Sequence, residues 1–439
     1  MRIHRFVFGT LMFWAGLGVT AVAAARSVPP LHSPPARMIL TAALEQAARN
    51  RPELISAQAD LAAADLRLRH AGLPPNPELG VEWDNLGGDR PADESRETTV
   101  SLSQPVEIGG KPLARKEKIR AEIQRLQHEQ TVVWLDLAVE VRMAFIEVLN
   151  ARERLALQNE AEKTAADQVS MTREQVLSGK IAGTEETRAR AKMAETRAET
   201  HKLQRLLAEA ERNLAAVLLL PADTPVTAEG MLTREVPVPD RDTLLAEMKR
   251  SPLVAVRRSE TLVARTNLSL EQANAWSDPT LSLAVREVPD EDARAVAVGF
   301  SIPLPLFQRN QASLADAEAM THKATANEAA ATRRLHTEVF KAHELLVAAD
   351  REARTLQADG LGRAAEAAAA VQQGFRAGKF RYSDVLEASQ SLLTMKNRHL
   401  DALLDLNRAA ITLDRLLGKP ALPVLSTSFS PSSVPRSTP

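Results

Sequence analysis

Two phrases of the chain resemble each other, Ser101-Leu-Ser-Gln-Pro-Val-Glu-Ile-Gly-Gly110 and Phe300-Ser-Ile-Pro-Leu-Pro-Leu-Phe-Gln-Arg309, and each precedes a long stretch without proline. Four pairs of landmarks keep a separation of 198 or 199 positions: Pro105 and Pro303, Glu140 and Glu338, Gly179 and Gly378, and Pro221 and Pro420. A nearly constant offset over this distance indicates an internal duplication of the sequence, which predicts two structurally equivalent halves.

The composition of the 439 residues favours long helices over a compact enzyme-like domain. Aromatic residues make up only 3%, whereas alanine, leucine, glutamate, arginine and glutamine abound, as is typical of long helices packed through small side chains. The formal net charge is −1, so no basic field for nucleic acid is present. The absence of cysteine excludes disulfides, thiolate metal sites and a lipidated cysteine anchor.

The N-terminus has the pattern of a secretory signal peptide. Two basic residues precede an apolar run from Phe6 to Val22, and small residues end the run before Arg26. An uncleaved membrane anchor is the alternative, although the apolar run is short for that role. After this segment no run approaches the about 18 apolar residues of a spanning helix, so we expect any membrane crossing to use strands.

Alternation of apolar and polar side chains predicts four strands, at about 78–84, 98–104, 280–287 and 294–302. They form two β-hairpins, one in each half. Four strands cannot close a barrel, since the smallest barrels use about eight. Either the edges of the sheet lie against something else, or several chains pool their strands.

The proline-free intervals predict two helix hairpins, at 112–220 and 308–417. Apolar residues recur every seven positions in each interval, which indicates a packed helical seam; they include Trp134, Val141, Val148 and Leu155, then Val339, Leu346 and Ala353. Each interval is broken once by glycines, at Gly179 with Gly183 and at Gly374 with Gly378, so we expect the tips there. Pro52 is expected to bend or divide the preceding N-terminal helix.

These observations predict a mostly helical chain with a small β part and the following organisation. The segments are a signal peptide (1–25), a proline-rich leader (26–39), a first repeat (40–221), a linker (222–241), a second repeat (242–420) and a flexible tail (421–439).

Enzymatic machinery is not visible in the sequence. No phosphate-binding, dinucleotide-binding, zinc-protease or serine-hydrolase motif occurs, and the nine histidines are scattered. His336 and His343 are seven positions apart on one expected helix face and could share a metal ligand site. The simpler interpretation is that both are solvent-exposed polar residues. We therefore expect no catalytic residue, no cofactor and no metal site.

Three segments carry a family resemblance. They are Phe375-Arg-Ala-Gly-Lys-Phe-Arg-Tyr-Ser-Asp-Val-Leu-Glu-Ala388, Leu73-Pro-Pro-Asn-Pro-Glu-Leu79, and the pair Gln104–Lys111 with Ile302–Asn310. On these residues the chain resembles TolC-type outer-membrane efflux channels over nearly its whole mature length, closest to the CzcC-like heavy-metal branch. The branch often has a lipidated N-terminal cysteine, which this chain lacks.

The resemblance implies a homotrimer. Three copies of four strands would make a twelve-stranded β-barrel in the outer-membrane lipid, continued by an α-barrel across the periplasm. Such channels conduct substrate passively from an inner-membrane pump, proton-driven in the metal branch, through a periplasmic adaptor (membrane fusion) protein. The implied cargo is divalent heavy-metal cations such as cobalt, zinc or cadmium, and no nucleic acid is involved.

The resemblance also implies site residues. Asp384 and Glu387 correspond to acidic residues that narrow the pore, and capping of a helix start is the alternative role for them. The first half has Glu185 and Arg188 at the equivalent positions. The implied adaptor-docking residues are Val176, Leu177, Gly179, Phe375, Gly378 and Ser383. The implied barrel-to-helix junctions are Pro105, Gly109, Gly110, Pro303 and Pro305.

Two other functions stay open at this point. A channel for drugs or organic solutes would have the same sequence features, because a duct of this kind has no substrate pocket. A secreted coiled-coil scaffold without a pore would explain the sevenfold pattern and the repeat, but it would not explain the paired hairpins with alternating faces.

Overall fold

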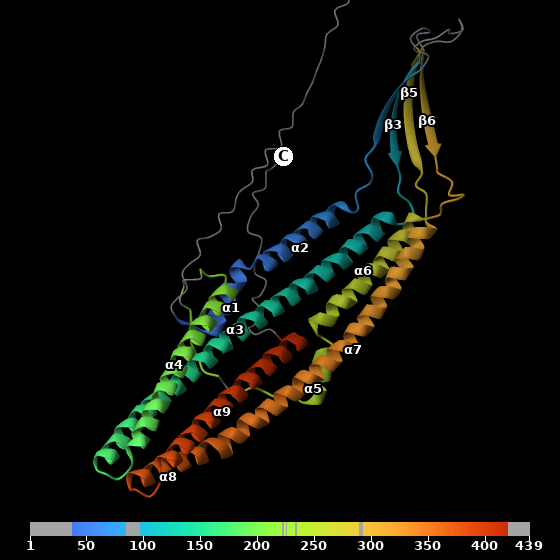
Figure 1. Cartoon of the computed structure of the whole chain (residues 1–439). Helices are drawn as coiled ribbons and strands as arrows, with labels where there is room; N and C mark the ends of the chain where they lie inside the picture. The colour runs from blue at the N-terminus through green and yellow to red at the C-terminus, as the bar shows by residue number, and fades with distance from the viewer. Residues whose placement is uncertain are drawn as a thin grey trace, which may run out of the picture. The chain divides into compact units, whose positions relative to one another are not determined.

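The computed structural model describes residues 37–84, 97–221, 224, 226–232, 235–288 and 293–419. The expected signal peptide, most of the expected leader, the C-terminal tail and the turn at 289–292 lie outside these residues. Figure 1 shows a mostly helical chain with one small sheet beside the ends of several helices, as the fold class predicted.

The first repeat begins with two helices, a β-hairpin and two long helices: α1 (Leu40–Asn50), α2 (Pro52–His70), β2 (Glu78–Asp84), β3 (Glu97–Pro105), α3 (Lys111–Leu177) and α4 (Gly183–Val217). The second repeat has the same order: α5 (Arg241–Met248), α6 (Pro252–Asn274), β5 (Thr280–Val288), β6 (Ala293–Ser301), α7 (Gln311–Thr355), η1 (Leu356–Leu361), α8 (Gly362–Arg376) and α9 (Tyr382–Leu417). Two short strands, β1 (Arg37–Met38) and β4 (Thr227–Ala228), pair in parallel. The sequence repeat therefore corresponds to a repeat in the order of helices and strands.

Proline divides the first helix of each repeat in the same way. Pro52 is the first residue of α2, and Pro252 is the first residue of α6. The residue before each proline has a non-helical ψ, 116° at Arg51 and 127° at Ser251, as proline requires of its predecessor. Of the two outcomes predicted for Pro52, a bend or a division of the helix, the division is confirmed, because α1 ends and α2 begins there.

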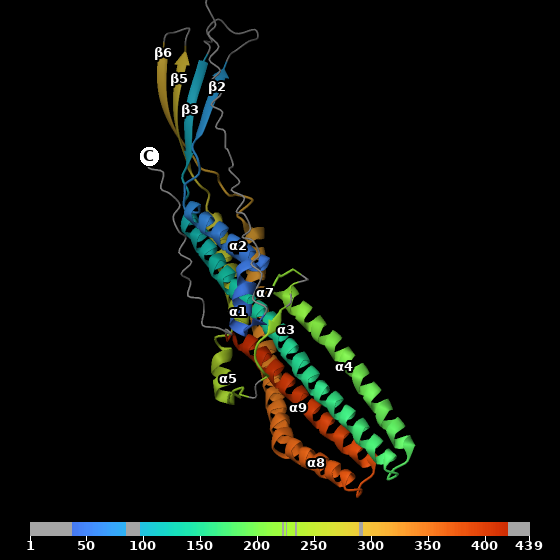
Figure 2. The same ribbon diagram turned by 90° about the vertical axis from the view of Figure 1, so that its left-hand side faces the viewer.

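The two β-hairpins join into one antiparallel sheet with the strand order β2-β3-β5-β6. Within each repeat the strands pair as a hairpin, and β3 pairs with β5 across the repeats, with Val100 opposite Val285. Figure 2 shows the four strands side by side. The sheet thus ties the first repeat to the second.

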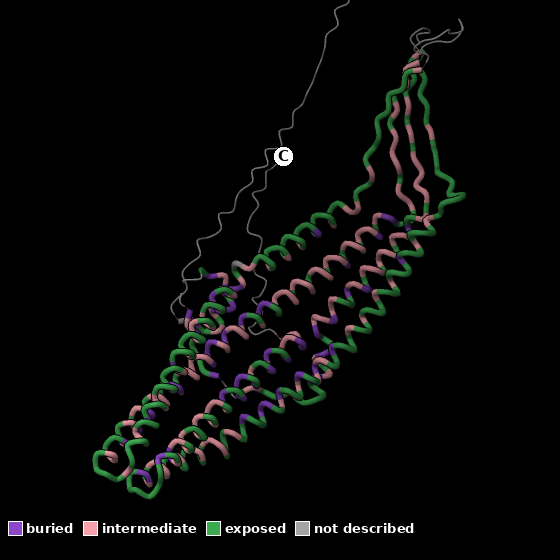
Figure 3. The backbone as a smooth tube through the Cα atoms, viewed as in Figure 1, coloured by how far each residue is buried: buried purple, intermediate pink, exposed green. Residues whose placement is uncertain are grey.

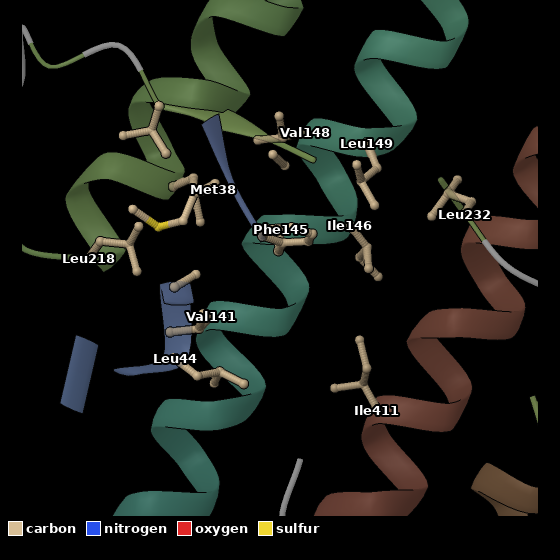
Figure 4. Packing of buried hydrophobic residues seen from close by; sticks show 14 of the residues in the cluster. Met38, Leu44, Val141, Phe145, Ile146, Val148, Leu149, Leu218, Leu232 and Ile411 are labelled. Atoms are coloured by element: carbon tan, nitrogen blue, oxygen red, sulfur yellow. The ribbon is translucent and has the colours of Figure 1, made fainter. Parts of the chain in front are cut away.

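The helical seam lies where the sevenfold pattern predicts it. Val141 and Val148 of α3 are fully buried, and so is Val339 of α7. Figure 4 shows Val141, Phe145 and Val148 packed against Leu44 and Met38, and all five belong to the larger apolar core. Figure 3 shows that buried residues recur along the faces of the helices that meet, while the outward faces are exposed.

Ion pairs run along the contact between α3 and α9 and connect the two repeats. Asp136 pairs with Arg415 at 2.6 Å and Glu160 pairs with Lys396 at 2.9 Å. Arg154 and Asp401 form another such pair. Each exposed pair contributes little, up to about 1 kcal/mol, so the apolar seam supplies most of the packing energy.

A π-helix explains why the repeat offset changes from 198 to 199. The offset is 198 at Glu338 and 199 at Gly378, so the second repeat has one additional residue between these points. The structure places η1 in this interval, whereas α3 of the first repeat is α-helical throughout. A π turn takes up one more residue than an α turn and so keeps the packed face in step on both sides. Sequence reasoning expected only one break in this interval.

Gly179 and Gly378 end their helices by the same motif. Gly179 has φ +69° and Gly378 has φ +74°. Lys180 N–H donates to Gln175 O, and Lys379 N–H donates to Gly374 O, which is the six-residue hydrogen bond of a glycine-terminated helix. The prediction that Gly374 breaks the helix is wrong, because Gly374 lies inside α8. Glycine is needed there because the Phe380 ring folds back onto it and leaves no room for a Cβ.

Candidate functional site

The four-stranded sheet has one apolar face that no described residue covers. Directly paired residues of adjacent strands lie on the same face. One such row is Leu79, Leu102, Leu283 and Val298, with exposed fractions of 72%, 49%, 49% and 81%. The next row is Val81, Val100, Val285 and Val296, all more than 40% exposed. A water-exposed face of this kind is costly, so it marks a surface for an apolar environment.

The opposite face of the sheet is small and polar. Its central row is Gly80, Ser101, Ala284 and Ala297, and the next row contains Ser103, Ser282 and Gly299. A Cβ at Gly80 would lie 2.7 Å from Ser101 Oγ, so the two side-chain positions crowd each other. The strands β2 and β6 are the two edges, and neither has a second partner strand among the described residues. The sheet therefore has one apolar face, one small polar face and two open edges.

The first junction between sheet and helix is held by a charged cluster. Pro105 ends β3, and Asp278 reaches across from the second repeat. Asp278 accepts hydrogen bonds from Ile108 N–H at 3.0 Å and from Lys111 Nζ at 2.6 Å. Burial raises the pKa of Asp278, but these hydrogen bonds and the Lys111 charge outweigh it and hold the pKa below its ordinary value. Asp278 is therefore ionised at neutral pH.

A second ion pair completes this junction. Both carboxylate oxygens of Glu107 accept hydrogen bonds from the guanidinium of Arg115, and the Glu107 side chain is 11% exposed. The hydrogen bond from Arg115 lowers the pKa of Glu107 more than burial raises it. Glu107 thus fixes the loop between β3 and α3 to α3, whereas Asp278 ties the same loop to the segment before β5.

The second junction has no equivalent cluster among the described residues. Pro303 and Pro305 lie between β6 and α7, and the exposed large apolar residues of this loop are Ile302, Leu304, Leu306 and Phe307. Asn310 directly precedes α7 as Gly110 directly precedes α3, with φ +59° against +78°. Its side-chain Nδ2 donates to Glu271 Oε2 at 2.8 Å, which holds the helix start. The two helix starts share a left-handed residue directly before the helix and differ in side-chain chemistry.

The replacement Gly109→Ala is expected to destabilise the first junction. Gly109 has φ +73°, which costs a residue with a Cβ about 1–2 kcal/mol, and a Cβ there would lie 2.8 Å from Trp276 Cδ1. Thermal unfolding followed by circular dichroism measures the loss. Gly110→Asn is the matched control, because Gly110 has open space around it and Asn310 already fills the place directly before α7. Equal stability of wild type and Gly109→Ala would contradict this reading.

The two helix tips lie side by side and share a small apolar core. This tip core consists of the buried residues Ala189, Phe375, Tyr382 and Val385. Phe375 and Tyr382 have ring centroids 6.1 Å apart. Gln175 of the first tip donates from Nε2 to Phe375 O of the second at 3.1 Å. Sequence reasoning missed Gln175, Tyr382 and this contact between the tips.

The predicted docking residues divide into exposed and buried ones. Leu177 is 78% exposed, and Gly179, Gly378 and Ser383 are exposed as well, whereas Val176 is half-buried. Phe375 is only 1% exposed. In this conformation the Phe375 side chain supports the tip from inside and does not present a surface to a partner.

The predicted pore acids have different surroundings. Asp384 is half-buried and accepts a hydrogen bond from Arg381 N–H at 2.9 Å, so it caps the start of α9. Glu387 is exposed one turn later. In the first repeat Glu185 pairs with Arg188 at 3.2 Å, so the equivalent positions neutralise each other. The capping role of Asp384 is therefore observed, and a pore role remains a prediction.

Metal and membrane signatures can be checked only over the described residues. There, no three acidic or histidine side chains gather into a metal-binding group. His336 stacks on Phe340 and His343 contacts Pro239 O at 2.9 Å, so the two histidines do not share a ligand position. None of the described helices combines the length and the apolar character needed to cross a membrane.

Comparisons with known proteins agree with this geometry. The Outer membrane efflux protein family matches residues 43–218 and 254–419, one segment in each repeat. The cobalt-zinc-cadmium resistance protein CzcC of Cupriavidus metallidurans is 30% identical over 386 residues, which cover 87% of this chain and 90% of that protein. The nickel and cobalt resistance protein CnrC of the same organism is 26% identical over 271 residues, covering 61% of this chain and 64% of that protein.

Solved structures show the same fold. The outer membrane protein VceC of Vibrio cholerae superposes with a TM-score of 0.69 at 20% identity, covering 86% of this chain and 96% of that one. CusC gives a TM-score of 0.70 at 20% identity, covering 86% of this chain and 91% of that one. With two family matches, one in each repeat, and a relative aligned over nearly its whole length, the chain belongs to the outer membrane efflux protein family and is an outer-membrane efflux channel with a large periplasmic helical portion.

Proposed function

We propose that the chain forms a homotrimer that serves as the exit duct of a tripartite efflux system. Three copies of the sheet would pair edge to edge, β6 of one with β2 of the next, into a twelve-stranded barrel. The helices would continue this barrel across the periplasm. An inner-membrane pump, driven by protons, would deliver substrate through a periplasmic adaptor protein.

The sheet is the observation that supports this proposal most. Its apolar face suits lipid, and its small polar face suits a water-filled interior. Its two open edges need partner strands, because unpaired backbone groups are costly inside a bilayer. A single copy cannot supply those strands, whereas a ring of copies can. Crosslinking of the purified channel in membranes would give a trimer band, and a purely monomeric product would contradict the proposal.

We propose divalent heavy-metal cations as the exported substrate. The support comes from the relatives: CzcC is named for cobalt, zinc and cadmium resistance, and CnrC for nickel and cobalt resistance. The described part of the chain adds no metal-binding cluster of its own, which suits a passive duct. A strain lacking the chain should become sensitive to these cations and stay resistant to drugs. Sensitivity to drugs alone would favour the alternative, a channel for drugs or organic solutes.

The tips are the proposed gate and docking site. Asp384 and Glu387 of three copies would form a ring of carboxylates that favours cations. We expect the double change to alanine to raise single-channel conductance, because it removes both the charge and the cap of α9. The change Asp384→Asn with Glu387→Gln keeps an oxygen acceptor for Arg381 N–H and removes only the charge. Loss of cation selectivity in this second variant supports the ring, and unaltered selectivity and conductance in both variants exclude it.

A further inference from the structure

The outermost turns of the two helix hairpins are strongly basic. Residues 177–184 and 376–383 contain Lys180, Arg376, Lys379 and Arg381 and no acidic residue, although the whole chain has a formal net charge of −1. All four basic side chains belong to exposed residues. We call these two segments the basic tip. The basic tip therefore concentrates positive charge at one end of the helices.

The four basic side chains of the basic tip have no ion-pair partner in the described part of the chain, where the neighbouring glutamates pair with other arginines. Glu185 and Glu186, just inside the first tip, already pair with Arg188 and Arg190. Asp384 is engaged in capping Arg381 N–H. The remaining nearby acids, Glu174 and Glu387, are exposed and lie outside the two turns.

Two apolar side chains stand among these charges. Leu177 is 78% exposed and Phe380 is 46% exposed. Phe380 is held in place, since its ring lies on Gly374, where a Cβ would not fit. The surface thus combines a positioned aromatic ring, an exposed leucine and four cations. Apolar anchors surrounded by charge are typical of protein interfaces, where the charges set the choice of partner.

We propose that the basic tip binds a partner whose own tip presents acidic side chains around an apolar contact. The inference rests on the proposed docking function of the tips and names the chemistry of the partner. In a trimer the basic tips would place twelve cationic groups around one opening. Such a ring attracts acidic groups, so an acidic partner would dock there.

Binding of a short peptide of alternating glutamate and leucine to the purified full-length channel tests the proposal. Fluorescence anisotropy of the labelled peptide gives the affinity, and a lysine-leucine peptide of equal length serves as the opposite probe. We expect the acidic peptide to bind and the basic peptide not to bind. The triple variant K180E/K379E/R381E should weaken binding at least about tenfold, and added salt should weaken it in the wild type.

A matched variant controls for the change in total charge. K323E/R333E/R363E reverses three exposed basic residues away from the tips that form no ion pair among the described residues. It should bind the acidic peptide as the wild type does. Equal binding by the tip variant and the wild type would overturn the proposal, as would equal weakening in both triple variants. Conductance in a planar bilayer is measured separately, so a channel that binds the peptide without conducting contradicts the proposed function and not this inference.

Discussion

Phe375→Ala is expected to open both helix tips locally while the rest of the chain stays folded. Phe375 is the largest purely apolar side chain among the buried residues of the tip core and is 1% exposed, and truncation of such a residue costs about 3–5 kcal/mol. The tip core has four buried members, with Val169, Met171, Ile181 and Val371 partly buried against them, so the Phe375 ring supplies a large share of its apolar contacts. Amide hydrogen exchange in residues 371–390 should become about a hundredfold faster or more, because exchange follows the free energy of local opening.

Two controls separate packing from location. Leu177→Ala changes a residue of the same tip that is 78% exposed, and we expect wild-type exchange there. Phe375→Leu keeps part of the volume and should fall between wild type and alanine. Exchange in the core around Val141 and Val148 should be unaffected by all three changes. Unchanged exchange at the tips of Phe375→Ala would show that this core does not hold the tips together.

The sequence predicts the strands and long helices well because their signals are local. Alternation predicts strands at about 78–84 and 280–287, and the structure has β2 at Glu78–Asp84 and β5 at Thr280–Val288. Sevenfold spacing predicts the buried positions Val141, Val148 and Val339. Both signals depend on residues within a few positions of each other. Periodicity can therefore be read without knowledge of the fold.

Contacts between distant residues were not predictable in this way. Asp278 holds Lys111 although 167 positions separate them, and Gln175 holds Phe375 O across 200. Nothing local marks either partner, since an aspartate before a strand or a glutamine near a helix end is ordinary. The tip motif likewise indicated Phe375 without indicating that its side chain points inward. Which face of a turn is buried depends on the second hairpin, which lies beside the first only after folding.

The π-helix was predictable only in part. Its signal, the change of repeat offset from 198 to 199, is present in the sequence. An inserted residue can be absorbed as a π turn, a bulge or a shift of the whole helix, and sequence alone does not choose among them. Here the buried positions continue on both sides, with Val339, Leu346 and Ala353 before η1 and Phe375 after it. Because the same face of the helix stays packed on both sides of η1, the inserted residue is absorbed as a local π turn and not as a rotation of the whole helix.

Val298→Arg is expected to prevent assembly in the outer membrane. Val298 lies on the apolar face of β6 and is 81% exposed, so in the proposed barrel it faces lipid. An arginine facing the middle of the bilayer costs about 2–4 kcal/mol, and each of three copies would bear that cost.

Ala297→Arg is the matched control, because Ala297 is the adjacent residue on the opposite, polar face of the same strand. Outer-membrane fractionation followed by unheated gel electrophoresis should show the trimer for wild type and Ala297→Arg and little for Val298→Arg. Equal trimer levels in the two variants would mean that the apolar face does not meet lipid, and the proposed orientation of the barrel would be wrong.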